Sequence, residues 1–318
     1  MKKRKYLTEF ALLAVSETKL IIPVEQLKYV EDKDAFHIYT ILAIEKIRFD
    51  SYKCFKNYIE AVFFYMKEGK QNKLNIKIGL HQELDHSNVS IASVFPFDDL
   101  KIKIDDDVFL DKFNWKKEFD ISSEELFLLF SGNQSEPLKF EVCYIGQAQG
   151  KDGSRNAIDR LESHETLQKI LADENKKDRR VWVCLFEFTT NLITSHDGVS
   201  KEYIMSDLED QNHAKKVLSD LPIYNQVINI TEAAMINYFK PFYNTDYVNN
   251  FPNIKHKGYR QYFDLDYNSL RIELGLVFDK LPQVIFYTET NKISSEWEYI
   301  EYGLFNDKDR KSMFEIFK

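Results

Sequence analysis

Glycine, proline and cysteine are all scarce in this sequence of 318 residues, which holds 10, 7 and 3 of them. So few glycines and prolines exclude long flexible linkers and low-complexity chains. The three cysteines, Cys54, Cys143 and Cys184, are far apart, and none lies in a C-x-x-C pair. This pattern is typical of a reducing compartment and predicts neither a disulfide framework nor a zinc site.

Long apolar runs are also missing. No run approaches the roughly 18 residues that a membrane-spanning helix needs. The N-terminus, MKKRKYLTEFALLAVSETK, imitates a signal peptide, but its apolar run Phe10–Val15 is short and Glu17 and Lys19 follow at once. We therefore expect a cytoplasmic protein without a membrane partner. The sequence leaves the oligomeric state open.

Positive charge is in deficit, because the formal net charge is -8. This argues against a protein that coats nucleic acid nonspecifically, since phosphate binding is driven by Lys and Arg. It permits a nuclease, because a metal site needs carboxylates and a basic face can be local. Hydrophobic residues make up 44% of the chain, so it can build packed cores, and its length suits two domains.

The expected fold class is α+β, with residues 1–120 as a separate mixed α/β N-terminal domain. Apolar residues recur three to four apart over Asp34–Asp50 and Ser51–Gly69, which predicts two helices. After Gly69 alternate residues are apolar, which predicts strands. We expect this domain to recognise a target or a partner.

Residues 121–250 are expected to form a second domain. Its predicted strands are Leu126–Phe130, Lys139–Ile145 and Val181–Phe188, and the third is so apolar that we expect it to be central and buried. Helices are predicted over residues 154–171 and Thr231–Phe239.

The remaining residues, 251–318, are expected to be a strand-rich C-terminal extension. Strands are predicted near Gln261–Tyr267, Leu270–Val277 and Gln283–Thr288, followed by a helix over Asp307–Lys318.

Three short pieces of the second domain carry residue types that suit phosphate chemistry. Tyr144-Ile145-Gly146 ends a predicted strand, and glycine lets a phosphate approach the backbone. Arg160 and His164 lie four apart, so on a helix they share one face and can bind phosphate oxygens together. Glu232 offers a hard oxygen ligand for Mg²⁺ or Mn²⁺, and Asn244 follows a proline-limited helix. Taken singly, these residues are also ordinary turn, surface and capping groups.

Together and in this order, the pieces resemble the GIY-YIG nuclease superfamily over about residues 126–247. Tyr144–Ala148 matches a YIG-x-A strand, and Arg160-Leu161-x-x-His164 matches the following helix. The segment Glu232–Asn244 is similar to the last motif in the nuclease domain of the excinuclease members of that superfamily. The resemblance implies a small antiparallel sheet flanked by helices. It also implies an endonuclease that hydrolyses phosphodiester bonds, with DNA favoured over RNA as its partner.

The resemblance also implies the roles of the site residues. Glu232 binds one Mg²⁺ or Mn²⁺ ion, and Tyr144, Arg160 and His164 complete the catalytic set. Gly146, Lys151 and Asn244 are the expected substrate-binding residues.

The family's first strand carries a Gly-Ile-Tyr-like triplet. The segment assigned to it, Leu126–Gly132, reads LFLLFSG, with Phe130 in place of the tyrosine. This leaves an alternative open, a catalytically impaired GIY-YIG-fold module that binds nucleic acid or protein. The polar segment Thr189–Ile230 is expected to be an insertion, and the basic run Lys176–Arg180 a DNA-backbone contact.

Overall fold

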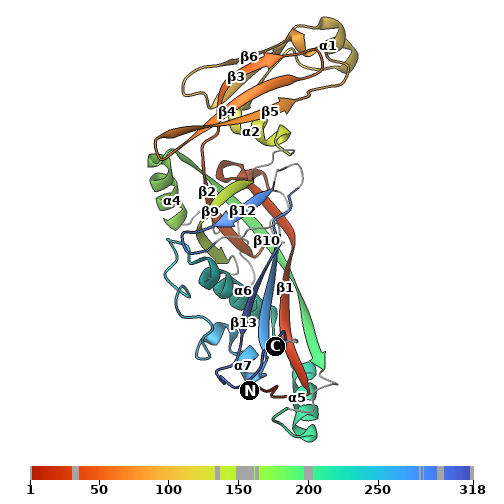
Figure 1. Cartoon of the computed structure of the whole chain (residues 1–318), viewed down its shortest axis with the longest axis vertical. Coiled ribbons are helices and arrows are strands. Elements are labelled where there is room, and N and C mark those ends of the chain that lie inside the picture. The colour runs from red at the N-terminus through yellow and green to blue at the C-terminus, as the bar shows by residue number, and fades with distance from the viewer. Residues whose placement is uncertain are drawn as a thin grey trace.

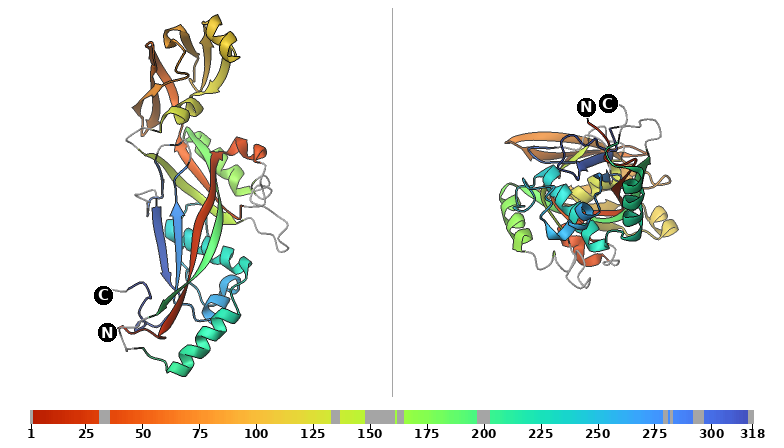
Figure 2. Two further views of the ribbon diagram at one scale, coloured as in Figure 1. Left: turned by 90° about the vertical axis from the view of Figure 1, so that its right-hand side faces the viewer. Right: turned by 90° about the horizontal axis from the view of Figure 1, so that it is seen from below.

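The chain adopts an α+β fold in this computed structural model, in agreement with the predicted class (Figure 1). One long twisted sheet forms the body of the molecule, and a smaller lobe lies at one end of it (Figures 1 and 2). The structure describes residues 2–30, 36–132, 137–147, 161, 165–196, 203–278, 281, 283–291 and 297–315.

The body is a seven-stranded sheet. Its strands, in spatial order, are β12 (Val284–Tyr287), β9 (Leu138–Gln147), β2 (Ile38–Glu45), β10 (Arg179–His196), β1 (Thr8–Pro23), β11 (Ser269–Gly275) and β13 (Trp297–Gly303). Two neighbouring pairs, β12 with β9 and β1 with β11, are parallel, and the others are antiparallel. The prediction that Val181–Phe188 is a central, buried strand is confirmed, because it lies in β10 between β2 and β1.

Helices cover both faces of the sheet near β2. Ile38 belongs to an apolar cluster that includes side chains of α6 (Tyr224–Phe239), whereas Tyr39 belongs to a second cluster that includes side chains of α4 (Glu165–Lys176). Successive strand residues point to opposite faces. Strand β2 is therefore buried on both sides, and Figure 1 shows α4 beside it and α6 lower on the sheet.

The smaller lobe, residues 46–130, is called the inserted lobe because it lies between two neighbouring strands of the body, β2 and β9 (Figure 1). It contains two three-stranded antiparallel sheets and two short helices. The first sheet is β3 (Arg48–Cys54), β4 (Ile59–Lys67) and β5 (Lys70–Ile78), and the second is β6 (Val89–Ser93), β7 (Asp99–Ile104) and β8 (Glu118–Ser122). The helices are α1 (Asp107–Phe113) and α2 (Ser123–Phe130).

Two predicted helices of the N-terminal half are wrong. Asp34–Asp50 contains strand β2 and the start of β3, and Ser51–Gly69 contains the rest of β3 and all of β4. A spacing of three to four arose over the first segment because β2 is apolar on both faces. In β4 the buried residues are Ile59, Ala61 and Phe63, which is the period of a strand.

The predicted strand Leu126–Phe130 is also wrong, because these residues belong to helix α2. Ser122 caps this helix, since its side-chain oxygen accepts a hydrogen bond from the backbone N–H of Glu125. A Ser-x-x-Glu sequence before an apolar run is a helix-start signal. The apolar run that follows is the buried side of a helix, not a strand.

The other predictions for the second half have mixed outcomes. Lys139–Ile145 lies in β9 and Thr231–Phe239 lies in α6, as predicted. Within Gln261–Tyr267 the structure has helix α7 (Gln261–Asp264), not a strand. Residues 307–315 form turns and an isolated bridge with Lys3, not the predicted helix. Among the described residues of the expected insertion, Thr189–Ile230, are the end of β10, helix α5 (Asp207–Ser219) and the start of α6.

The large sheet contains strands from all three expected segments, 1–120, 121–250 and 251–318. Strands β1 and β2 come from the first expected segment, β9 and β10 from the second, and β11, β12 and β13 from the third. Of the three strands expected for the small antiparallel sheet, Lys139–Ile145 and Val181–Phe188 lie in β9 and β10, which flank β2 and pair with it antiparallel inside this larger mixed sheet.

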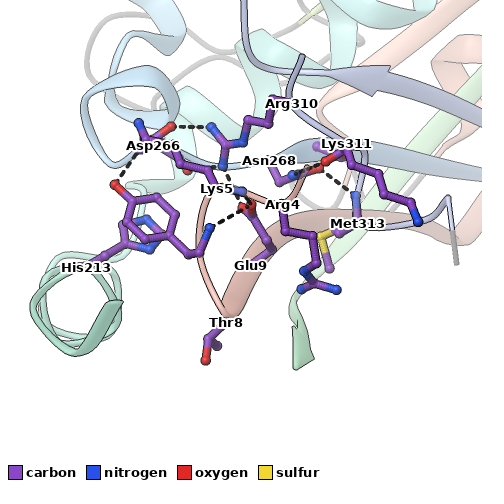
Figure 3. Close-up of polar contacts among 12 residues, drawn as sticks. Arg4, Lys5, Thr8, Glu9, His213, Asp266, Asn268, Arg310, Lys311 and Met313 are labelled. Carbon is purple, nitrogen blue, oxygen red and sulfur yellow. Dashed lines mark hydrogen bonds and ion pairs between the residues drawn. The ribbon is translucent and has the colours of Figure 1, made fainter. Parts of the chain in front are cut away.

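The N-terminal and C-terminal segments meet at the far end of the sheet, in a buried cluster of charges (Figure 3). The guanidinium of Arg310 lies 2.6 Å from a carboxylate oxygen of Glu9 and 2.5 Å from one of Asp266. Lys5 forms a further ion pair with Asp266. Burial by itself would raise the pKa of Asp266, but Arg310 and Lys5 outweigh it and lower that pKa.

Candidate active site

Tyr144 and Gly146 lie on β9, and their partners across the antiparallel ladder are Ile41 and Tyr39 of β2. Residues directly opposite each other share one face of a sheet, so both tyrosines lie on the same face. Their ring centroids are 6.2 Å apart. Tyr39 is fully buried, whereas Tyr144 is partly exposed.

Gly146 permits this packing because it has no side chain, and its backbone angles are ordinary. A Cβ atom placed on it would lie 2.6 Å from the hydroxyl oxygen of Tyr39 and 2.8 Å from a ring carbon of Tyr144. Both distances are far inside normal contact. The absence of a side chain at this position is therefore needed by the protein's own tyrosines.

Tyr39 packs beside Tyr144 but is not among the residues that the sequence pattern singles out. It is the second residue of strand β2, after Ile38. Two features hid it: the inserted lobe separates it from Tyr144, and a helical spacing was assigned to its segment. The placement of Phe130 in the role of the first-strand tyrosine is wrong, because Phe130 ends helix α2 in the inserted lobe.

Asn244 is bound to the backbone of β9 by two hydrogen bonds. Its side-chain oxygen accepts from the N–H of Ile145 at 2.9 Å, and its side-chain nitrogen donates to the carbonyl of the same residue at 2.8 Å. The backbone N–H of Tyr243 also donates to the carbonyl of Cys143. Helix α6 ends just before, at Lys240 in the left-handed conformation, and Pro241 cannot continue a helix.

Glu232 lies in the middle of α6, since that helix begins at Tyr224. It is only 8% exposed, so it is not a capping carboxylate at a helix start. One turn earlier, the side-chain oxygen of Asn229 accepts a hydrogen bond from Gln147 at 2.6 Å. This contact joins the middle of α6 to the end of β9, three residues after Tyr144.

Tyr247 is close enough to Glu232 to be affected by its charge, and it contacts His256. The Tyr247 oxygen is 3.0 Å from Nε2 of His256, while Nδ1 of His256 accepts from the N–H of Gly258. In neutral His256 the proton therefore sits on Nε2 and points to Tyr247. Burial, followed by the negative charge of Glu232, raises the pKa of Tyr247 to about 12. The phenol thus stays protonated and can donate a hydrogen bond.

Three predicted site residues, Lys151, Arg160 and His164, lie outside the described residues. Leu161 is described, and it is fully buried in the cluster that contains Tyr39.

Within the predicted basic contact Lys176–Arg180, the two arginines bind carboxylates inside the protein. Arg179 lies 2.6 Å from a carboxylate oxygen of Glu141, and Arg180 forms an ion pair with Glu124. Both arginines are mostly buried, whereas the side chains of Lys176 and Lys177 are 76% and 57% exposed and lie beside Asp173 and Glu174. The predicted contact with the DNA backbone therefore depends on the two lysines.

Comparison of the chain with known protein families, with curated proteins and with solved structures gave no match. Within the described part of the chain, no helix is long and apolar enough to cross a membrane. The same residues contain no group of three His, Cys, Asp or Glu side chains placed to hold a metal ion.

Proposed function

We propose that this chain is a metal-dependent endonuclease of the GIY-YIG type that hydrolyses phosphodiester bonds in nucleic acid, with DNA favoured over RNA. The observation that carries the proposal is the packing of Tyr39 and Tyr144 around Gly146 on two neighbouring antiparallel strands. The GIY-YIG resemblance implies one tyrosine on each of its first two strands. Tyr39 and Tyr144 fit those two positions.

The metal ligand in this proposal is Glu232. A carboxylate suits Mg²⁺ or Mn²⁺, which are hard cations that keep several waters and need few protein ligands. Glu232 is 8% exposed, and charges act more strongly on each other in such a water-poor setting. When bound, the cation supplies charge neutralisation at the phosphate and at the leaving oxygen.

The other residues would bind and orient the reactants. Tyr144, which is partly exposed, orients the attacking water. Arg160 holds the phosphate through a forked pair of hydrogen bonds, and His164 supports that contact. Lys151 is a weaker candidate for a contact with the nucleic-acid backbone. Asn244 keeps the end of β9 in place through its two bonds to Ile145.

The alternative function is a GIY-YIG-fold module that binds nucleic acid or protein without efficient cleavage. Its main support was the lack of a tyrosine on the assigned first strand. Tyr39 supports the enzyme instead, because it lies on the strand next to Tyr144 and on the same face.

The test is cleavage of supercoiled plasmid DNA, with and without Mg²⁺ or Mn²⁺, by the full chain and by Glu232→Gln. We expect nicking or linearisation only with metal, and a loss of at least about a hundredfold in rate for the variant, as for other groups that stabilise a transition state. Its melting temperature should stay close to that of the wild type. Equal cleavage by the two proteins would show that Glu232 is not the metal ligand, and no cleavage by the wild type would favour the alternative.

A further inference from the structure

Charge is unevenly divided within the inserted lobe. Residues 46–78, which form the sheet β3-β4-β5, contain eight Lys and Arg against three Asp and Glu, a net charge of +5. Residues 79–130 contain five Lys and Arg against twelve Asp and Glu, a net charge of -7. The chain as a whole is acidic, so the basic sheet is a local exception to the charge of the molecule.

Part of this basic sheet borders a groove against the body. The groove has a volume of about 510 Å³, and three lysines line it: Lys67 and Lys73 from β4 and β5, and Lys139 from β9. All three are exposed. Glu45 is the one carboxylate among the described residues that line it. Lys73 is also 3.0 Å from Asp50, but both side chains reach solvent and such a pair is weak.

The same strand leads from the groove to the candidate active site. In the ladder with β2, Glu141 lies opposite Ala43 and Tyr144 opposite Ile41, so both point to one face. Lys139 is two residues before Glu141 and shares that face. The path from Lys139 to Tyr144 along β9 is about 15 Å, allowing for the bulge in the strand. This corresponds to four or five base-pair rises of about 3.4 Å in duplex DNA.

We propose that the groove lined by Lys67, Lys73 and Lys139 docks the phosphate backbone of duplex DNA, about half a helical turn from the bond that is cut. This inference rests on the proposed nuclease function and names the surface through which the inserted lobe serves it. The lysines act as point charges toward phosphates, which sets affinity and register without reading base sequence. The acidic sheet β6-β7-β8 would be repelled by the same backbone, which orients the lobe with its basic sheet toward the DNA.

The test is binding of a fluorescently labelled DNA duplex of about 20 base pairs to the full chain in EDTA, measured by anisotropy over a range of salt concentrations. The groove variant is Lys67→Glu, Lys73→Glu and Lys139→Glu together. The matched control is Lys103→Glu, Lys112→Glu and Lys117→Glu, which changes the net charge equally. The control lysines lie in the acidic half, beside Asp105, Glu83 and Asp107.

We expect the groove variant to bind at least about thirtyfold more weakly near 0.1 M salt, with a salt slope smaller by about two to three, because each lost phosphate contact removes about 0.9 from the slope. The control should stay within about threefold of the wild type. Equal losses in the two variants, or tight binding of duplex RNA without binding of DNA, would overturn the proposal. Plasmid cleavage by the wild type is scored separately. The binding result can therefore contradict the docking proposal while cleavage supports the nuclease proposal. The reverse outcome, DNA binding through the groove without cleavage, is equally distinguishable.

Discussion

Among single residues of the candidate site, Gly146 stands at a position that has no room for a side chain. The rings of Tyr39 and Tyr144 occupy the space that any side chain there would need. A glycine in a strand usually weakens it, because glycine loses more conformational freedom on folding and packs no side chain. Here the close approach of the two tyrosines explains why a glycine stands within the strand.

We expect Gly146→Ala to lower the free energy of unfolding by about 1–3 kcal/mol, the usual cost of overpacking a tight site. The measurement is chemical denaturation of the full chain. Gly132→Ala is the matched control, because a Cβ there would meet nothing within 4 Å. A loss at Gly146 no larger than the loss at Gly132 would mean that the tyrosines move apart easily.

Glu232 illustrates how one residue can depend on several elements. It lies on α6, yet the residue one turn before it, Asn229, contacts both Gln147 at the end of β9 and the carbonyl of Gly258. Tyr247 and His256 come from the segment after α6 and form their own hydrogen bond nearby. The position of the carboxylate is thus set by three separate parts of the chain.

At the scale of elements, strand β9 connects the parts of the candidate site. One of its edges pairs with β2 over most of its length. Its other edge pairs with β12 at Leu138–Glu141, and beyond that with the segment that follows α6, through Tyr243 and Asn244. The strand that carries Tyr144 is therefore bound to the helix that carries Glu232 at Asn229 and to the segment after that helix at Asn244.

We expect Asn244→Ala to lower the free energy of unfolding by about 1–3 kcal/mol, because it removes the partners of a backbone N–H and a backbone carbonyl together. Asn244→Asp should not rescue it, since a carboxylate cannot donate to the carbonyl of Ile145. Chemical denaturation gives the comparison, with the exposed Asn249→Ala as control. If Asn244→Asp were as stable as the wild type, the bond to the carbonyl would contribute nothing.

At the scale of the whole molecule, two long-range arrangements organise the chain. The inserted lobe leaves the body after β2 and returns before β9, so two strands that are neighbours in the sheet are separated by about a third of the chain. At the opposite end, Arg310 connects the C-terminal segment to Glu9 near the N-terminus (Figure 3). Both arrangements make the body a single unit built from the beginning, middle and end of the sequence.

Arg310 and Glu9 are 2% and 0% exposed, so neither charge can turn to water if its partner is removed. We expect Arg310→Met to lower the free energy of unfolding by about 3 kcal/mol. This is the lower end of the usual loss when one partner of a buried ion pair is removed. The backbone N–H groups of Lys5 and Tyr6 still bind Glu9, which limits the cost.

The double variant Glu9→Gln with Arg310→Met provides the control for that prediction. It removes the uncompensated negative charge, so it should recover about 1 kcal/mol or more relative to Arg310→Met alone. Both are measured by chemical denaturation at neutral pH. If the two substitutions lowered stability additively, the buried pair would not be coupled, and the charge of Glu9 would not be the source of the loss.

Four features could be predicted from the amino-acid sequence: the α+β class, the strand that carries Tyr144, the buried strand Val181–Phe188 and the helix that carries Glu232. Each of these is a local pattern: a strand that ends in glycine, a continuous apolar run, or a helix that stops before Pro241. Local patterns survive in any tertiary context that buries them.

The position of Tyr39 beside Tyr144 follows from the fold and not from any local pattern. Strand pairing is long-range, and nothing in residues 46–130 indicates that the chain returns to the strand it left. Burial on both faces of β2 also removed the alternation that would have identified it as a strand. The sequence singled out Asn244 but not its partner Ile145, and it did not indicate the lysine groove, because hydrogen bonds and local charge depend on which segments meet in space.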